Sequence, residues 1–169
     1  MKQIIFILVF VFFNLGNAQT KEVSETELYD KAQIIEVEYY EKCFEADSLK
    51  FRHKVYESYS ELVKYFPNSK KRSIYLYSKG FYSIDNEEAK KCYSEVIQIN
   101  DKNWQFYIRE SYMMLSWYAI NEKEYKTAKK YLDIIDKMKK PVFRCGYELE
   151  SYYSRLKNLR KSCKEGLKN

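Results

Sequence analysis

The chain has 169 residues, a formal net charge of +6 and 18 tyrosines, but it has 4 glycines, 2 prolines and 1 histidine. So few glycines and prolines cannot supply the many turns of an all-β fold, and the composition favours helices. Because there is one histidine and no Cys-x-x-Cys pair, the usual zinc sites are excluded, and we expect no metal and no cofactor.

The first 18 residues have the layout of a secretory signal peptide. Lys2 precedes an apolar run over residues 4–13, and small and polar residues follow up to Ala18, after which we expect cleavage. The run is shorter than the roughly 20 residues that span a bilayer, so a permanent anchor is the weaker interpretation. We therefore expect an exported protein, periplasmic or secreted, whose residues 19–169 form one domain.

Helical spacing of apolar residues predicts two helices before Pro67. Ser24 and Glu27 form a capping box for a helix over about 24–46. Ser48 starts a second helix, which must end near residue 66 because proline lacks an amide donor and disfavours a helical residue before it.

The next four predicted helices form two more hairpins. Asn68 or Ser69 begins the third helix, which closes at 80–84, and Asp85 caps the fourth. Asp101 or Asn103 caps the fifth helix, and the sixth covers about 125–135. The three hairpins span about 24–66, 69–100 and 102–140.

Pro141 fits the first turn of a seventh helix over about 141–165. Its apolar residues recur at steps of three and four: Val142, Cys145, Leu149, Tyr152, Leu156, Leu159 and Cys163. A free-standing coiled coil would show the same seam. We interpret this helix as a terminal element docked on the hairpins.

The second helices of the hairpins align with one another. Val55, Ala89 and Ala128 fall in register at spacings of 34 and 39 residues, followed four residues later by Tyr59, Tyr93 and Leu132. A period of 34 residues is that of the tetratricopeptide repeat, and the chain resembles that family. The Tyr-Phe-Pro-Asn-Ser stretch at 65–69 looks like the repeats of exported bacterial envelope members. The middle repeat departs from the family pattern, with Tyr77 where a glycine is usual and Gly80 where a ring is usual.

The resemblance implies an all-α, right-handed superhelix of three hairpins with a C-terminal capping helix. It also implies a scaffold that binds a protein or peptide partner in the cell envelope. The alternative is a structural or assembly subunit of an envelope or outer-membrane complex. In such stacks the first helix of each hairpin lines a concave groove, which here would carry Val37, Tyr40, Phe44, Lys71, Ile74, Ser78, Phe81, Glu110, Met113 and Trp117. This second apolar set must be covered by the last helix or form an exposed patch.

Candidate catalytic groups are few, and we do not expect an enzyme. His53 lies in a basic stretch, where a surface histidine is the simpler interpretation. Two carboxylate pairs, Glu87 with Glu88 and Glu36 with Glu38, could in principle act in acid–base catalysis. Glu87 and Glu88 sit in a first helical turn, where negative charge is favoured without catalysis.

The four cysteines leave alternatives open. They are interpreted as buried free thiols, with a Cys43–Cys92 disulfide as the alternative pairing. Cys145 and Cys163 lie roughly 27 Å apart on one predicted helix at 1.5 Å per residue, so they cannot bridge each other.

Charge is distributed unevenly along the chain. Residues 20–49 hold nine acids and three bases, whereas 126–169 hold thirteen bases and five acids. A solvated helix face explains this, and peripheral contact of the basic C-terminal helix with an anionic surface is the sharper hypothesis. We expect no nucleic acid partner, and the sequence does not select an oligomeric state.

Overall fold

A computed structural model describes residues 23–44, 48–142 and 146–168 of the chain, and the predicted signal peptide lies outside these ranges. The described residues form seven α-helices and one short 3-10 turn, which confirms the all-α fold. The helices are α2 (Glu25–Lys42), α3 (Ser48–Tyr65), α4 (Arg72–Tyr82), α5 (Asn86–Ile99), α6 (Gln105–Asn121), α7 (Tyr125–Lys137) and α8 (Gly146–Gly166), with the 3-10 turn η1 (Lys102–Trp104) before α6.

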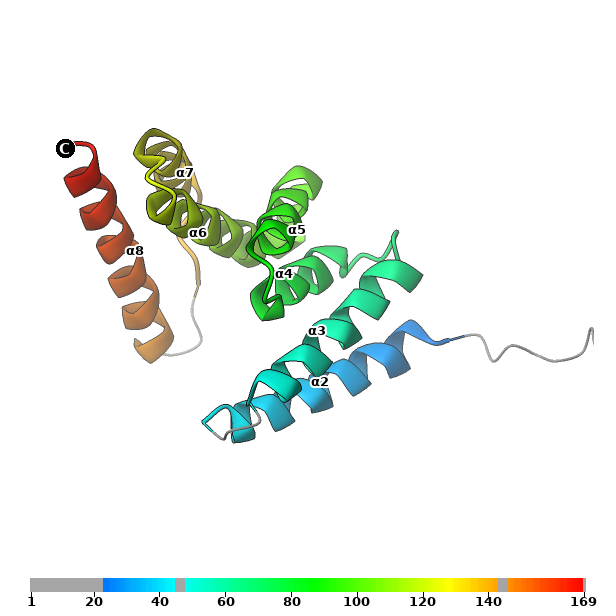
Figure 1. Cartoon of the computed structure of the whole chain (residues 1–169). Helices are drawn as coiled ribbons and strands as arrows, with labels where there is room; N and C mark the ends of the chain where they lie inside the picture. The colour runs from blue at the N-terminus through cyan, green and yellow to red at the C-terminus, as the bar shows by residue number, and fades with distance from the viewer. Residues whose placement is uncertain (1–22, 45–47, 143–145, 169) are drawn as a thin grey trace, which may run out of the picture.

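Each helix packs against the next one in the chain. Figure 1 shows the pairs α2/α3, α4/α5 and α6/α7 following one another across the molecule, with α8 at the far end. α8 packs on both α6 and α7, and α4 also touches α6. The fold is therefore a sequential array of antiparallel helix pairs closed at one end by a single helix.

Several predicted helix boundaries are confirmed. The Ser24 hydroxyl accepts the Glu27 amide at 3.4 Å, and Asp85 Oδ1 accepts the amides of Glu87 and Glu88 at 2.8 and 3.4 Å. α3 ends at Tyr65, two residues before Pro67. These side-chain oxygens satisfy amides that the first helical turn leaves without partners.

Two helices begin later than expected. Ser69 accepts the Lys71 amide at 2.9 Å inside a turn, and α4 starts only at Arg72. α8 starts at Gly146 instead of Pro141, and Val142 is 92% exposed, so its assignment to the buried stripe is wrong. The guanidinium of Arg109 binds the Lys139 carbonyl, which holds the chain before Pro141 on α6 in a non-helical path.

The positions of Tyr77 and Gly80 on α4 have a packing reason. α4 crosses α5 closely at Gly80, where an added Cβ would lie 3.1 Å from the Cys92 Cβ and 3.3 Å from the Ala89 carbonyl oxygen. The ring of Tyr77, half-buried, lies instead beside Tyr93, with ring centroids 5.7 Å apart. The small residue thus stands where the two backbones meet, and the ring fills the wider space one turn earlier.

Candidate binding face

The ten residues predicted to line a groove divide into a reachable and a buried group. Five are exposed apolar side chains: Val37 and Tyr40 on α2, Phe44 just after it, Phe81 on α4 and Trp117 on α6. Lys71 is half-buried, and the other four are buried: Ile74, Ser78, Glu110 and Met113. A partner could therefore reach this face on α2, at the end of α4 and on the C-terminal half of α6.

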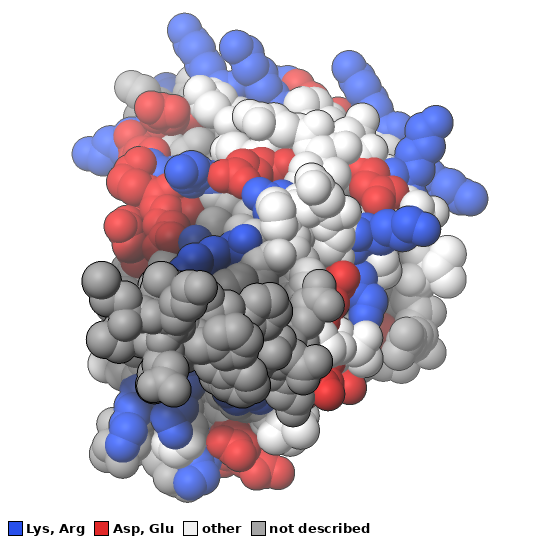
Figure 2. Space-filling view, turned by 90° about the vertical axis from the view of Figure 1, so that its right-hand side faces the viewer, with Lys and Arg blue, Asp and Glu red and all other residues white. Residues whose placement is uncertain are grey.

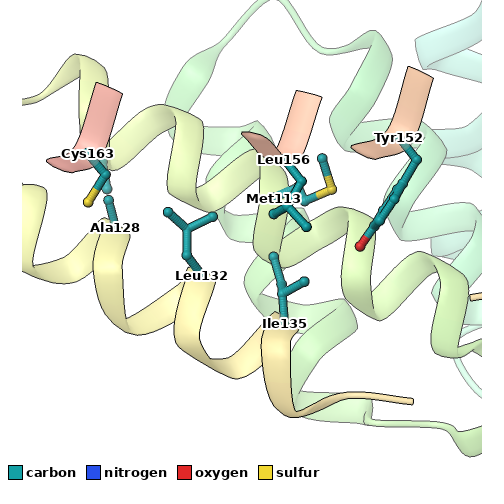
Figure 3. Close-up of a cluster of buried hydrophobic side chains, with 8 residues drawn as sticks. Met113, Ala128, Leu132, Ile135, Tyr152, Leu156 and Cys163 are labelled. Atoms are coloured by element: carbon teal, nitrogen blue, oxygen red, sulfur yellow. The ribbon is translucent and has the colours of Figure 1, made fainter. Parts of the chain in front are cut away.

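α8 covers the buried residues of α6. Met113 packs with Tyr152 and Leu156 of α8 in the cluster drawn in Figure 3. Glu110 is 2% exposed and accepts two hydrogen bonds from Arg155 of α8, at 3.0 and 3.1 Å. The last helix therefore covers Glu110 and packs on Met113, which is the first of the two expected alternatives, and the placement of Glu110 in an open groove is wrong.

Of the predicted groove residues on α4, Ile74 is buried in the cluster that α2 and α3 also form. Ile74 lies in the same apolar cluster as Ala32 of α2. The ring of Tyr75 lies 5.4 Å from that of Tyr29, and the Tyr75 hydroxyl donates to Glu25 at 2.7 Å. Because these long side chains fill the space between the two helices, Ile74 is a core residue and not a groove residue.

An open groove of about 500 Å³ remains between α6 and α8. Its apolar lining comes from Met113, Met114, Trp117, Ile120 and Leu159. Its polar lining comes from Asn121, Arg155, Asn158 and Ser162. We call this the α6–α8 groove; a mainly apolar concavity with a few polar groups is the usual form of a ligand site.

A smaller hollow of about 120 Å³ lies between α2 and α4. It is lined by Glu36, Tyr40, Tyr77, Ser78, Phe81 and Tyr82, and we call it the α2–α4 pocket. Burial, reinforced by hydrogen bonds with Tyr40 and Glu36, raises the pKa of Tyr82 far above its ordinary value, so its hydroxyl stays protonated.

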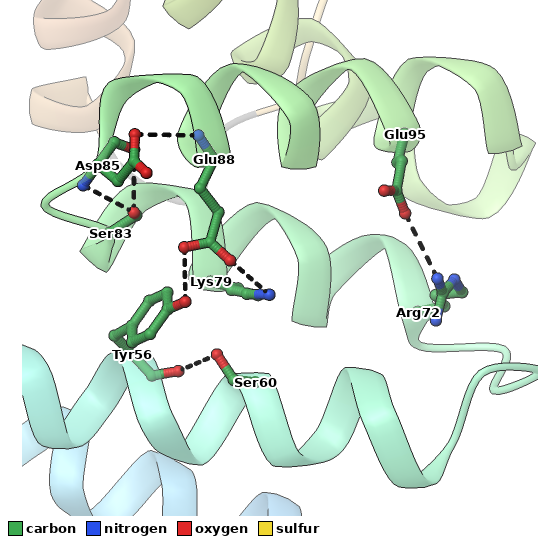
Figure 4. A network of polar contacts seen from close by, with 8 residues as sticks. All are labelled: Tyr56, Ser60, Arg72, Lys79, Ser83, Asp85, Glu88 and Glu95. Atoms are coloured by element: carbon green, nitrogen blue, oxygen red, sulfur yellow. Dashed lines mark hydrogen bonds and ion pairs between the residues drawn. The ribbon is translucent and has the colours of Figure 1, made fainter.

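The acidic pair at the start of α5 is structural. Figure 4 shows Glu88 held by two residues of neighbouring helices: the Tyr56 hydroxyl donates to it at 2.6 Å and the Lys79 ammonium lies 2.9 Å away. The hydrogen bond from Lys79, and then that from Tyr56, lowers the pKa of the Glu88 carboxyl. This carboxylate therefore links α3, α4 and α5.

The single histidine is exposed, and the three cysteines that the structure describes are free thiols. His53 is exposed, stacked on Tyr56 and 3.2 Å from Glu57. Cys43 and Cys92 are both free, so the alternative disulfide is absent, and burial raises the pKa of the Cys92 thiol to about 11. Within the described ranges, no group of His, Cys, Asp and Glu side chains could hold a metal ion. Cys145 lies outside the described residues.

Of the groove residues that were not predicted, Met114 and Ile120 are the two apolar ones on α6. Each follows a core residue of α6, Met113 and Ala119, by one position. The signal that could have found them is that α6 is apolar around most of its circumference from 113 to 120. Such a helix needs cover on more than one side, or it leaves an apolar surface exposed.

Charges of both signs mix on the side of the molecule seen in Figure 2, where acidic and basic side chains alternate around uncharged surface. On α8, Lys157, Lys161 and Lys164 are exposed at positions that share one helix face. None of the described helices combines the length and apolarity that crossing a membrane requires.

In comparisons with protein-family models, with curated proteins and with solved structures, no match was found for this chain.

Proposed function

We propose that this protein is a non-catalytic binding module that takes an apolar segment of a protein partner in the α6–α8 groove. The observation that carries the proposal is Trp117, which is 46% exposed beside Met113 and Met114 in a concavity of about 500 Å³. Tryptophan is enriched among the residues that dominate binding energy, and methionine adapts its shape to varied apolar partners.

The groove favours a short peptide segment over a small polar molecule. Its lining offers one charged group, Arg155, which Glu110 already holds on two hydrogen bonds. Asn121, Asn158 and Ser162 remain to bind backbone or side-chain polar groups of a segment anchored by apolar side chains.

Two further parts of the proposal come from the sequence. The resemblance to the tetratricopeptide family supports a protein-binding role, and the sequential helix pairs are consistent with it. The pattern of residues 1–18 supports a place in the cell envelope, periplasmic or secreted. A non-catalytic role is supported by the structural use of Glu88 and by the exposed position of the single histidine.

A second candidate is an assembly subunit that docks through its basic C-terminal helix. It is favoured by Lys157, Lys161 and Lys164, which are exposed on one face of α8 and would meet an acidic partner or an anionic surface. This face and the α6–α8 groove use different residues, so variants can separate the two candidates.

The test is selection of binding peptides from a random library on the immobilised protein. We expect the enriched peptides to share an apolar anchor and to lose about tenfold or more in affinity with Trp117→Ala, a loss typical of such a residue. Phe106→Ala is the matched control, because Phe106 is also 46% exposed on α6 but does not line the groove.

Selected peptides that bind Trp117→Ala as tightly as the native protein would contradict the groove. A partner captured from the envelope that binds Trp117→Ala normally, but is lost when Lys157, Lys161 and Lys164 are changed to Glu, would favour the assembly subunit.

A further inference from the structure

The α2–α4 pocket contains a carboxylate that is held in place by tyrosines. Glu36 accepts the hydroxyl of Tyr59 at 2.6 Å on one oxygen and that of Tyr82 at 2.7 Å on the other. The hydroxyl oxygens of Tyr82 and Tyr40 lie 3.0 Å apart, and since Tyr82 uses its one proton toward Glu36, Tyr40 is the donor in that contact. Glu36 of α2 is therefore held by hydroxyls of α3 and α4, and it lines the pocket.

Glu36 differs from the other anchored carboxylates in its charge balance. Glu88 has Lys79 at 2.9 Å and Glu110 has Arg155 at 3.0 Å, but no basic side chain of the described residues forms an ion pair with Glu36. Arg52 donates to the carbonyls of residues 81–83 and Arg155 binds Glu110, so both guanidinium groups have partners other than Glu36. A half-buried negative charge in a hollow thus lacks a cation.

Aromatic rings in several orientations form the rest of the pocket. Phe81 is nearly parallel to Tyr77, with ring centroids 6.3 Å apart, and nearly perpendicular to Tyr82 at 5.1 Å. Tyr40 and Phe81 are 56% and 41% exposed, so the pocket opens to solvent between them. Ring faces attract cations through their negative quadrupole, and several rings around one point form the cages that recognise alkylammonium groups.

We propose that the α2–α4 pocket binds an alkylammonium cation, with Glu36 supplying the charge and the rings of Tyr40, Tyr77 and Phe81 surrounding the ammonium head. A hollow of about 120 Å³ has room for a group several times larger than a water molecule. A hard metal ion fits poorly, because calcium and magnesium take six or more oxygen ligands and the pocket offers one carboxylate among rings. A purely apolar guest would leave the carboxylate without compensation.

This chemistry has two natural sources, a lysine side chain of a protein partner and a free quaternary ammonium compound. The site stands apart from the proposed function, because none of its lining residues lines the α6–α8 groove. Trp117→Ala should therefore leave cation binding unchanged, and a failure of peptide binding would not affect this site.

The test titrates the purified protein with three probes, followed by calorimetry or by NMR shifts of the pocket residues. The probes are choline, Nα-acetyl-lysine N-methylamide and 3,3-dimethylbutan-1-ol, the last being the uncharged analogue of choline. We expect at least one cation to bind about tenfold more tightly than the neutral analogue. Tighter binding of choline indicates a quaternary ammonium ligand, and tighter binding of the lysine derivative indicates a partner's side chain.

Two variants and one control locate the binding. Glu36→Gln keeps an acceptor oxygen for one of the two tyrosines and removes the charge, and it should weaken cation binding by about tenfold or more. Phe81→Leu changes a partly exposed ring, leaves the Glu36 contacts in place and should weaken binding about fivefold. Glu38→Gln, an exposed carboxylate on the same helix, should change nothing.

Equal binding of choline and its neutral analogue would overturn the proposal. Unchanged affinity for the cation in both Glu36→Gln and Phe81→Leu would also overturn it. So would the absence of cation binding at a probe concentration of about 50 mM, which is chosen to lie above the dissociation constant of a weak specific site.

Discussion

At the α2–α4 contact, tyrosine hydroxyls of α4 reach carboxylates of α2: Tyr75 to Glu25 and Tyr82 to Glu36. At the contacts of α8 with α6 and α7, by contrast, Leu132, Leu156 and Cys163 belong to an apolar cluster, and the ion pairs of Arg155 and Arg160 lie beside it. Hydrogen bonds require set distances and directions, whereas apolar packing requires mainly area and shape. The hydrogen bonds of the α2–α4 contact therefore fix how these two helices lie relative to each other. The contacts of α8 are stabilised mainly by the burial of apolar side chains.

The largest expected effect comes from the apolar end. Leu132→Ala removes a side chain that is 4% exposed in the cluster of Figure 3, and it should lower the free energy of unfolding by about 2–5 kcal/mol. Urea denaturation with an unchanged m-value measures this loss. Ile134→Ala, on the same helix but 37% exposed, is the matched control and should cost far less. Equal losses in the two variants would mean that α8 does not cover α7.

Next in size is the ion pair of Arg155 on α8 with the buried Glu110 on α6. Arg155→Met leaves Glu110, whose side chain is 3% exposed, without its partner, and we expect a loss of about 3 kcal/mol in the free energy of unfolding. Arg155 itself is 49% exposed, which keeps the loss at the lower end of the range for buried pairs. Chemical denaturation of the variant measures it.

The control for that variant is Arg160→Met. The partner of Arg160, Asp136, is 51% exposed, so this pair should contribute about 0–1 kcal/mol. Adding Glu110→Gln to Arg155→Met should recover part of the loss, because the buried charge is then gone. A double variant no more stable than Arg155→Met alone would refute a role for the charge.

The smallest expected effect tests the hydroxyl-rich contact. Tyr75→Phe removes the hydrogen bond to Glu25 and should cost about 1 kcal/mol at neutral pH. Hydrogen bonds from Ser69 and then Tyr75 lower the pKa of Glu25, so the folded carboxyl has a pKa below the unfolded value of 4.5. Its contribution to stability is present above that value and is lost as the pH falls through the folded pKa.

Denaturation at several pH values measures this linkage. The difference between the native protein and Tyr75→Phe should be largest near pH 7 and should shrink below about pH 4. Tyr65→Phe is the control, since that ring is 51% exposed and its hydroxyl forms no hydrogen bond with a carboxylate of the described residues. If the difference in the free energy of unfolding does not change with pH, the contribution of the Tyr75 hydroxyl does not depend on the charge of Glu25, which would contradict the prediction.

Local signals in the sequence were sufficient for most of the helix array. Pro67 and the capping oxygens of Ser24 and Asp85 act within four residues, so their effects can be predicted without knowing the fold. The start of α8 could not be predicted in this way, because Arg109, 30 residues earlier, binds the carbonyl of Lys139.

The candidate site was predicted less well, because it too depends on contacts between residues that are far apart in the sequence. That Trp117 and Tyr40 are exposed follows from their position beside the core stripe. That Glu110 is buried depends on Arg155, 45 residues away, and the use of Glu36 depends on hydroxyls 23 and 46 residues away. Helical spacing describes one helix at a time, so it gives no information on which neighbouring helix supplies the partner.

The packing of each helix on the next has a consequence for how the chain folds. The main contacts that skip a helix join α2 to α4, α4 to α6 and α6 to α8, and most other contacts join helices that are neighbours in the chain. Most contacts are therefore local and require little loss of chain entropy before they form. During synthesis the N-terminal part of the chain is made first, so each new helix can pack on one that has already formed. α8 is the last to arrive, and until it does, Met113 and Leu132 of the helices that it covers stay in contact with water.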